Sequence, residues 1–458
     1  MVYFFPLNSI KGFHKIIFLF IVRLSLISCE LRFVLTIFRH GARSPMAEGV
    51  DFLGEKWDTY MQLTDVGIRQ MYLLGTKNRK KYSSFLSSTY NPKEVCAFSS
   101  NWNRTILSAN AYLQGLFPFN LESQISNEKL KNSNPPVSVS ELADEMKKLN
   151  SYPLPYGMQI ITVGIIPEKD RLNTFYNSCP NSKGLLESNM ANEKIQNFVK
   201  EFNSNYKEKI TKALSIEDKE LFLNFKNIVR FFGVFYSDYV DNRKMNTLRD
   251  SGVDFEELNK TAFNSFILDN FEFFAGNKDF NNIFSSPFLQ TISSYMKGRV
   301  DSDNQNKFEY TSSNPKMLIY SLHDYDIASL IATIQDFFDL PKKHYYPSFA
   351  SSLTFELDFD QTNKKFVIHL LFNDENIADI NYENFIATIP SKSLPQRQIN
   401  LICHGSEELS TGSINYYLFF TIIFGLIAIL EFILIYRKLR RSKLKHFVEF
   451  QKKETALL

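Results

Sequence analysis

The stretch that decides the fold of this chain reads Leu31-Arg-Phe-Val-Leu-Thr-Ile-Phe-Arg-His-Gly-Ala-Arg-Ser-Pro45. Its first half is mostly apolar and β-branched, which predicts a strand buried on both faces of a parallel sheet. Two arginines and a histidine then follow the strand, at Arg39, His40 and Arg43. Ligands of open α/β sheets bind at the carboxyl ends of strands, and paired guanidiniums match the oxygens of a phosphate. One interpretation is therefore a phosphate site, and the other is a basic surface turn.

Two later segments repeat this order of strand, polar break and helix. The strands are predicted at Lys93–Ser100 and Lys316–Leu322, and the helices at Ile106–Phe117 and Ile327–Ile334. The polar breaks contain Arg104 in the first segment, and His323 with Asp324 in the second. The helix after Asp324 presents its N-terminus to the same region, which favours an anion there.

The segment Arg39–Pro45 resembles the RHGxRxP signature of the histidine acid phosphatases, the larger-domain branch of the histidine phosphatase superfamily, of the lysosomal and prostatic type. The pair His323-Asp324 resembles the second catalytic signature of this family. The resemblance covers most of the chain from residue 31 to about residue 405. It implies an α/β fold, with a mixed but mostly parallel central sheet flanked by helices (phosphoglycerate mutase-like). It also implies an inserted helical cap at about residues 182–297.

The same resemblance implies an acid phosphatase that hydrolyses phosphate monoesters through a phosphohistidine. His40 is the implied nucleophile, because neutral imidazole can attack phosphorus directly. Asp324 is the implied general acid, which protonates the leaving oxygen. The implied phosphate-binding residues are Arg39, Arg43, Arg104 and His323. No cofactor and no metal are implied.

Other activities use the same motifs. Phytases, inositol polyphosphate phosphatases and lysophosphatidate phosphatases are alternatives within the enzymes, although phytase-like members usually carry more basic residues and more cysteines. A catalytically inactive, membrane-anchored binding module is the alternative outside them, but it would require a missing catalytic residue. A net charge of +3 without a dominant basic stripe argues against a nucleic-acid binder. The expected partner is a small phosphate monoester, and a homodimer is left open.

Both ends of the chain predict the secretory route. Residues 1–29 have the layout of a signal peptide. Residues 416–436 carry a single charge, Glu431, and would form a helix of about 31 Å, enough to cross a bilayer. The basic residues that follow predict a cytoplasmic tail at 437–458. We therefore expect a single-pass type I membrane protein whose catalytic domain, residues 30–410, is lumenal or extracellular.

The tail ends in Leu457-Leu458 after Glu454, which resembles an endosomal sorting signal with a spacing one residue short. Lysosomal, vacuolar or endosomal delivery is the hypothesis that this end supports. The cell surface is the alternative.

Removal of the signal peptide would leave three cysteines, Cys96, Cys179 and Cys403. Cys179 precedes a proline as in a family element that pairs with a late cysteine, so the resemblance implies a disulfide between Cys179 and Cys403. Cys96 lies in a predicted strand and is expected to be a buried thiol. Of two glycosylation sequons, the one at Asn259 is expected to be modified, whereas Asn103 lies in the proposed active site and is expected to stay unmodified.

Two local expectations concern helices. Thr64 is the predicted N-cap of a helix that buries Ile68, Met71, Tyr72 and Gly75, with Gly75 close to the sheet. Asp326 stands where relatives usually carry an uncharged residue. It would disfavour an anionic substrate if it faced the site, and otherwise it would cap the helix.

Overall fold

The computed structural model describes residues 29–46, 56–119, 124–166, 179–214, 222, 224–245, 248, 250, 252–304, 314–405 and 437. The chain divides into two units, Met1–Leu394 and Pro395–Leu458. In the second unit the described helix is α16 (Gln396–His404), which ends at Gly405 in the left-handed conformation. The predicted signal peptide, transmembrane segment and tail lie outside the described residues, apart from Cys29 and Arg437.

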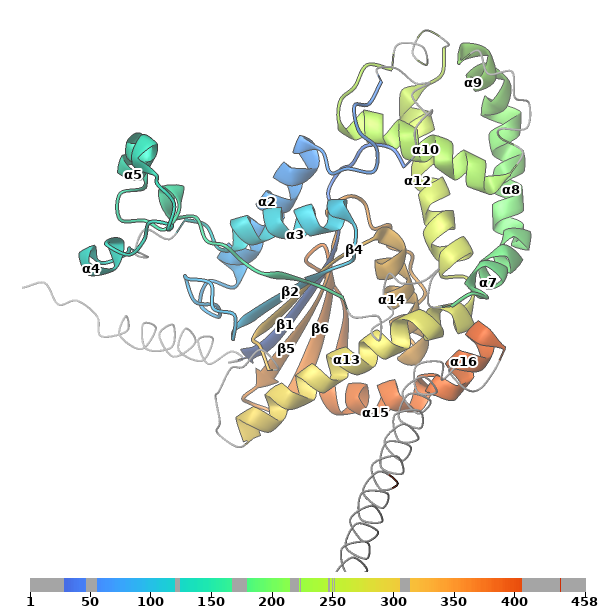
Figure 1. The fold of residues 1–458 in the computed structure, drawn as a ribbon. Helices are drawn as coiled ribbons and strands as arrows, with labels where there is room; N and C mark the ends of the chain where they lie inside the picture. Colours follow the sequence, from blue (N-terminus) through green and yellow to red (C-terminus); the bar gives the residue numbers. More distant parts are fainter. Residues whose placement is uncertain are drawn as a thin grey trace, which may run out of the picture. The chain divides into compact units, whose positions relative to one another are not determined.

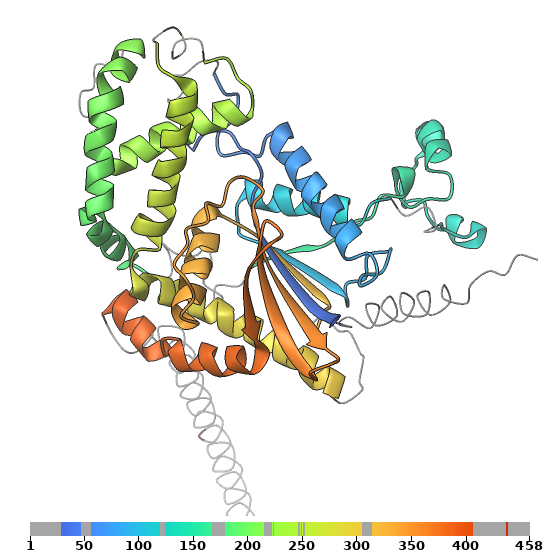
Figure 2. The same ribbon diagram turned by 180° about the vertical axis from the view of Figure 1, so that it is seen from behind.

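A seven-stranded sheet forms the centre of the first unit, in the order β3-β2-β4-β1-β5-β6-β7 (Figures 1 and 2). The parallel part contains β1 (Cys29–Arg39), β2 (Val95–Ser99), β3 (Val163–Ile165) and β4 (Met317–Leu322). The antiparallel part contains β5 (Ser352–Asp360), β6 (Lys365–Phe372) and β7 (Glu375–Asn381). The fold is therefore mixed α/β with a helix-flanked sheet, as predicted. The sheet is not mostly parallel, however, because three of its six strand pairings are parallel and three are antiparallel.

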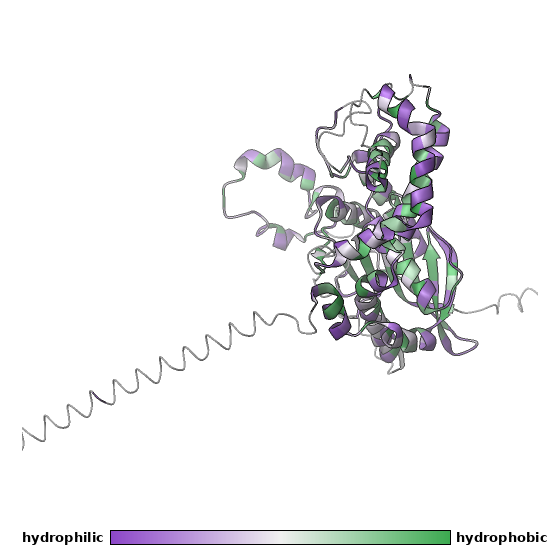
Figure 3. Cartoon of the chain, turned by 90° about the vertical axis from the view of Figure 1, so that its right-hand side faces the viewer, coloured by the Kyte–Doolittle hydropathy of each residue, from purple (hydrophilic) through white to green (hydrophobic). Residues whose placement is uncertain are grey.

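Strand β1 separates two hydrophobic clusters because its side chains alternate between the faces of the sheet. Phe33, Leu35 and Ile37 pack with the helices α13 (Lys278–Asn304), α14 (Asp324–Phe337) and α15 (Tyr382–Lys392). Val34 and Phe38 pack on the other face with α2 (Asp65–Lys81) and α3 (Asn103–Leu116). Figure 3 shows that the strands are mostly hydrophobic.

The two helices on that second face meet through glycines. A Cβ atom at Gly75 would lie 1.9 Å from the Tyr112 carbonyl oxygen, and one at Gly115 would lie 2.1 Å from the Tyr72 carbonyl oxygen. Gly75 was expected to let this helix lie close to the sheet, but the close approach that it permits is to α3. Thr64 caps α2 as predicted and accepts from the Gly67 amide.

The predicted buried face of α2 was also partly wrong. Its buried residues are Gly67, Met71, Gly75 and Asn78. Met71 and Gly75 are buried as predicted, but Ile68 and Tyr72 are exposed, because the buried face of α2 extends from Met71 and Gly75 to Gly67 and Asn78 instead.

A helical cap with its own core follows the third strand. Its helices are α7 (Ser182–Ser188), α8 (Glu193–Phe202), α9 (Glu208–Ala213), α10 (Phe225–Val240) and α12 (Phe255–Ile267), with π-helical turns at Asn203–Lys207 and Leu268–Phe274. Its buried centre is rich in phenylalanine, including Phe202, Phe231, Phe232 and Phe235. Helix α13, by contrast, packs on the sheet. The predicted cap boundary at residue 297 was therefore too late, because the cap core ends before α13.

Shorter elements complete the described chain. They are α4 (Asn127–Leu130) and α5 (Ala143–Leu149), with 3₁₀ turns at Ser140–Leu142, Pro155–Gly157 and Asn189–Ala191. Across the described residues, no helix is both long enough and apolar enough to span a membrane. Cys179 and Cys403 are each disulfide-bonded. Cys29 and Cys96 form no disulfide within the described residues, and Cys96 is only partly buried.

Candidate active site

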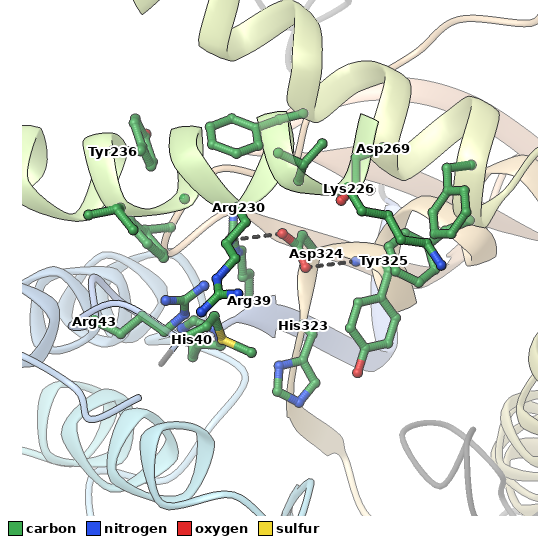
Figure 4. Close-up of a pocket in the computed structure, with 18 of the residues that line it drawn as sticks. Arg39, His40, Arg43, Lys226, Arg230, Tyr236, Asp269, His323, Asp324 and Tyr325 are labelled. Carbon is green, nitrogen blue, oxygen red and sulfur yellow. Dashed lines mark hydrogen bonds and ion pairs between the residues drawn. The ribbon is translucent and has the colours of Figure 1, made fainter. Parts of the chain in front are cut away.

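The predicted site residues come together where three parallel strands end. Arg39 on β1 is level with Leu322 on β4, and Ser99 on β2 is level with Ser321 on β4. The residues that follow these strand ends therefore meet at one edge of the sheet. They line a cavity of about 490 Å³ together with residues of the cap (Figure 4). The members from the sheet side are Arg39, His40, Arg43, Arg104, His323 and Asp324.

His40 is buried and held as a neutral imidazole. Its Nδ1 lies 2.8 Å from the Gly41 carbonyl oxygen. A carbonyl oxygen only accepts hydrogen bonds, so Nδ1 carries the proton and Nε2 keeps its lone pair. Burial, and then the charges of Arg39, His323, Arg104 and Arg43, place the pKa of His40 well below its ordinary value. The lowered pKa therefore favours the neutral ring, with an unprotonated Nε2, in acid.

Arg39 is the most firmly held of the three arginines. Its Nη2 lies 2.8 Å from Asp324 Oδ2, and its Nη1 donates to the Pro347 carbonyl at 2.8 Å. The guanidinium also lies 4.5 Å from the centre of the Phe349 ring. Burial lowers the pKa of Arg39, but the nearby Asp324 and Tyr346 outweigh burial and raise it. Arg39 therefore stays charged and keeps Asp324 in place.

Arg43 and Arg104 have no carboxylate of their own among the contacts of the described residues. Arg43 donates to the Ser44 carbonyl at 2.9 Å, and Arg104 lies 4.8 Å from the Trp102 ring. Burial and the neighbouring arginines lower the pKa of Arg43 to about 9. In the part of the chain that the structure describes, the buried Nε atoms of Arg39, Arg43 and Arg104 all lack an acceptor. Such crowding of buried cations suits an anion with several oxygens.

His323 is positioned by its backbone and by a hydroxyl. Its Nε2 lies 3.2 Å from Ser100 Oγ, which in turn lies 2.7 Å from Thr105 Oγ1. Its ring lies edge-on to His40, with the centroids 5.5 Å apart. Burial and the nearby arginines lower the pKa of His323 well below its usual range. Ser100 and Thr105 were not predicted as site residues, although Ser100 directly follows β2 and Thr105 lies in the first turn of α3.

Asp326 caps the helix and does not line the cavity. Its Oδ2 accepts from the His323 backbone amide at 3.0 Å, so it fixes the residue that precedes Asp324. Burial raises the pKa of Asp326 to about 8. Of the two interpretations of this carboxylate, the helix cap is the one that the geometry supports.

The cap supplies the opposite wall, which sequence analysis did not identify. Lys226, Arg230, Gly233 and Tyr236 of α10 line the cavity, as does Asp269 of the turn Leu268–Phe274. Burial, and then the charge of Asp324, raise the pKa of Asp269 to about 8. The residue pattern predicts that α10 is a helix, but it does not say which of its faces meets the sheet.

The two sequons lie outside this cavity. Asn103 is exposed in the first turn of α3, so its expected place inside the site was wrong: the neighbouring Arg104 points inward and Asn103 points outward. Asn259 is partly buried in the middle of α12. In the described residues no group of three or more His, Cys, Asp or Glu could hold a metal ion.

Comparison with known proteins gives one family. The model of the histidine phosphatase superfamily (branch 2) matches residues 30–373. Lysosomal acid phosphatase of Xenopus laevis is 38% identical over 132 residues, which cover 28% of this chain and 30% of that protein. Prostatic acid phosphatase of Homo sapiens is 39% identical over 110 residues, which cover 23% of this chain and 28% of that protein. The matches thus span less than a third of these relatives.

Solved structures share the fold at low identity. A phytase of Klebsiella sp ASR1 has a TM-score of 0.55 and 11% identity, covering 80% of this chain and 97% of the phytase. A phytase of Citrobacter braakii has a TM-score of 0.53 and 13% identity, covering 80% of this chain and 98% of the phytase. At such identities the likeness concerns the fold alone.

Proposed function

Since this chain belongs to the histidine phosphatase superfamily, branch 2, we propose that it is an acid phosphatase that hydrolyses phosphate monoesters through a phosphohistidine. One observation carries the proposal. A buried, neutral His40 presents Nε2 to a cavity that three buried or partly buried arginines also line. The arginines attract the phosphate, and they also keep the nucleophile unprotonated.

In the first step, Nε2 of His40 attacks phosphorus and the bond from phosphorus to the leaving oxygen breaks. Arg39, Arg43, Arg104 and His323 hold the phosphoryl oxygens as charge develops on them. Asp324 gives its proton to the leaving oxygen, so the alcohol departs neutral.

In the second step, water attacks the phosphohistidine and the bond from phosphorus to Nε2 breaks. Asp324, now a carboxylate, accepts the proton of the attacking water. His40 returns to its neutral form, and phosphate leaves.

The test is hydrolysis of p-nitrophenyl phosphate by the full-length chain, from acid to neutral pH, with a chelator present. We expect activity at acid pH that survives the chelator and falls by more than about 10³-fold in His40→Ala. His369→Ala is the matched control, because that histidine lies on β6 beside Asp379 and outside the cavity. An alkaline quench should trap one phosphoryl group on the peptide that contains His40.

Two results would contradict the proposal. Loss of activity with the chelator would indicate a metal-dependent reaction. A folded protein that hydrolyses neither p-nitrophenyl phosphate nor inositol hexakisphosphate nor lysophosphatidate would favour the inactive binding module.

We also propose the topology that the sequence predicts. Residues 1–29 would direct the chain into the secretory pathway, and residues 416–436 would anchor it with the catalytic domain lumenal or extracellular. Relatives from Xenopus laevis and Homo sapiens carry the name lysosomal acid phosphatase, which supports the lysosome over the cell surface.

A further inference from the structure

We infer that helix α10 forms a second anion subsite, which recognises an acidic group on the leaving-group side of the substrate. The inference rests on the proposed phosphatase function and adds a substrate class to it. That class is the phosphate monoester whose alcohol carries a second phosphate or a carboxylate. The residues that form the subsite are Arg230, Lys226 and Gly233.

One face of α10 is turned to the cavity. Lys226, Val229, Arg230, Gly233 and Tyr236 line it, and their spacing of three or four residues places them on one side of the helix. Figure 4 shows Arg230 and Lys226 on the α10 side, and His40 and His323 on the side of the sheet. A phosphate held by the arginines near His40 would therefore direct its leaving group toward this face of α10.

The charges on this face are not neutralised by the protein. Arg230 is exposed, and within the described residues it has neither a hydrogen bond nor an ion pair. Lys226 and Lys183 share one carboxylate, Glu187, at 3.9 and 3.8 Å, and all three side chains are at least half exposed. Exposed ion pairs of this kind contribute little stabilisation, so Glu187 holds the two lysines only weakly. The cap wall therefore carries positive charge that is available to a ligand.

The acidic residues of the cavity do not offset that charge. Asp324 is paired with Arg39 at 2.8 Å. Asp269 has a pKa raised to about 8 by burial and by Asp324, so its carboxyl is protonated in an acidic compartment. The reacting phosphate would occupy Arg43 and Arg104, which leaves Arg230 and the lysines for a second anion.

Gly233 provides an independent observation. It lies inside α10, where glycine is less favourable than alanine. A Cβ atom there would meet nothing within 4 Å, so packing does not require the glycine. The residue lines the cavity one turn away from Arg230. Its missing side chain leaves room for a substrate group beside the arginine.

The experiment compares matched substrates with the full-length protein at acid pH. Glycerol 3-phosphate is paired with 3-phosphoglycerate, which adds a carboxylate, and fructose 6-phosphate is paired with fructose 1,6-bisphosphate, which adds a phosphate. We expect kcat/KM to favour at least one acidic partner by about tenfold or more. The pair that shows the preference tells whether the second anion is a carboxylate or a phosphate.

Three variants assign that preference to the subsite. Arg230→Gln should remove most of it, so that kcat/KM falls about tenfold for the favoured acidic partner and clearly less for its neutral partner and for p-nitrophenyl phosphate, and Arg230→Lys should retain part of the preference. Arg69→Gln is the matched control, because this exposed arginine on α2 lies outside the cavity. Equal losses on all substrates in Arg230→Gln would overturn the inference, and so would a wild type without a preference.

A binding measurement separates the inference from the proposed function. His40→Ala protein should bind the favoured acidic compound about tenfold more tightly than its matched partner, and Arg230→Gln should abolish the difference. A protein that hydrolyses nothing but keeps this binding ratio contradicts the proposed function alone. A protein that hydrolyses p-nitrophenyl phosphate but shows no ratio contradicts the subsite alone.

Discussion

At the scale of single residues, the site sets the protonation of its own groups. Burial, and then the charges of the neighbouring arginines, lower the pKa of His40 and His323, which favours neutral rings where an ordinary histidine would be protonated. The Gly41 carbonyl then decides which nitrogen of His40 keeps its lone pair. Burial and the cation cluster thus favour an unprotonated Nε2 on His40 in acid, and the proposed mechanism uses this nitrogen as the nucleophile.

This arrangement predicts the acid side of the pH profile. The pKa of His40, the proposed nucleophile, is lowered, so protonation of its ring begins only well below the ordinary value of about 6.5. We expect kcat/KM for p-nitrophenyl phosphate to be maintained as the pH falls through that value. A fall of kcat/KM on the acid side of the pH profile, centred near the ordinary histidine pKa, would contradict the lowered pKa of His40.

The raised pKa of Asp326 predicts that the stability of the folded chain depends on pH. Its folded-state pKa is raised to about 8, whereas an unfolded aspartate has about 3.9. Between these values the folded chain binds the proton and the unfolded chain does not. The free energy of unfolding therefore falls as pH rises, by at most about 1.4 kcal/mol per pH unit from this group.

Asp326→Asn keeps an acceptor oxygen for the His323 amide but cannot ionise. Its unfolding free energy relative to wild type should therefore increase from acid to neutral pH, measured by chemical denaturation. Asp144→Asn is the control, because this aspartate is exposed on α5. A difference between Asp326→Asn and wild type that does not change with pH would argue against a buried protonated carboxyl.

At the scale of elements, the sequence predicts most of the parallel half of the sheet but not how its helices pair. The strands before Arg39, Arg104 and His323 are short apolar runs, and such runs can be recognised in the sequence as buried strands. Strand β7 (Glu375–Asn381) went unpredicted because it is a polar edge strand with few buried side chains. Helix α2 was predicted, but its contact with α3 was not. Hydrophobic periodicity indicates that one face of a helix is buried, but it does not indicate which element packs on that face.

The sequence also does not show which residues of the cap reach the site. Residues at strand ends could be placed from the sequence, since parallel strands bring their ends to one edge. Arg230 and Asp269 could not, because they reach the cavity only through the packing of a separate helical cap.

The glycine contact between α2 and α3 gives a prediction at this scale. Gly75→Ala would place a methyl group on the Tyr112 carbonyl, so we expect a loss of about 2 kcal/mol or more. Gly233→Ala meets open space and should gain about 0.5–1 kcal/mol. The free energies of unfolding of both variants and the wild type, measured with a chemical denaturant, test this difference. Equal effects would mean that the close approach of the two helices does not control stability.

At the scale of the whole molecule, the first unit contains separate hydrophobic clusters. Two of them cover the faces of the sheet, and the third fills the cap with phenylalanine side chains. The cavity draws its reactive residues from the sheet side and its opposite wall from the cap. Catalysis and selectivity are thus proposed to come from differently packed regions.

The proposed topology makes a prediction for the complete chain. In cells, full-length protein should stay in the membrane fraction after alkaline carbonate extraction, because residues 416–436 would span the bilayer. A chain that stops after residue 411 should appear in the medium with its phosphatase activity. Recovery of the full-length protein in the soluble fraction would contradict the anchor.

The separate core of the cap has a consequence for protein engineering. Exchanges at the cavity-facing positions of α10 need not disturb the phenylalanine side chains behind them, because these belong to the other faces of the helix. A combinatorial library at residues 226, 229, 230 and 233 should therefore yield mostly folded proteins with an unaltered reactive centre. Such a library would make the chain a scaffold for selecting dephosphorylating enzymes of chosen preference.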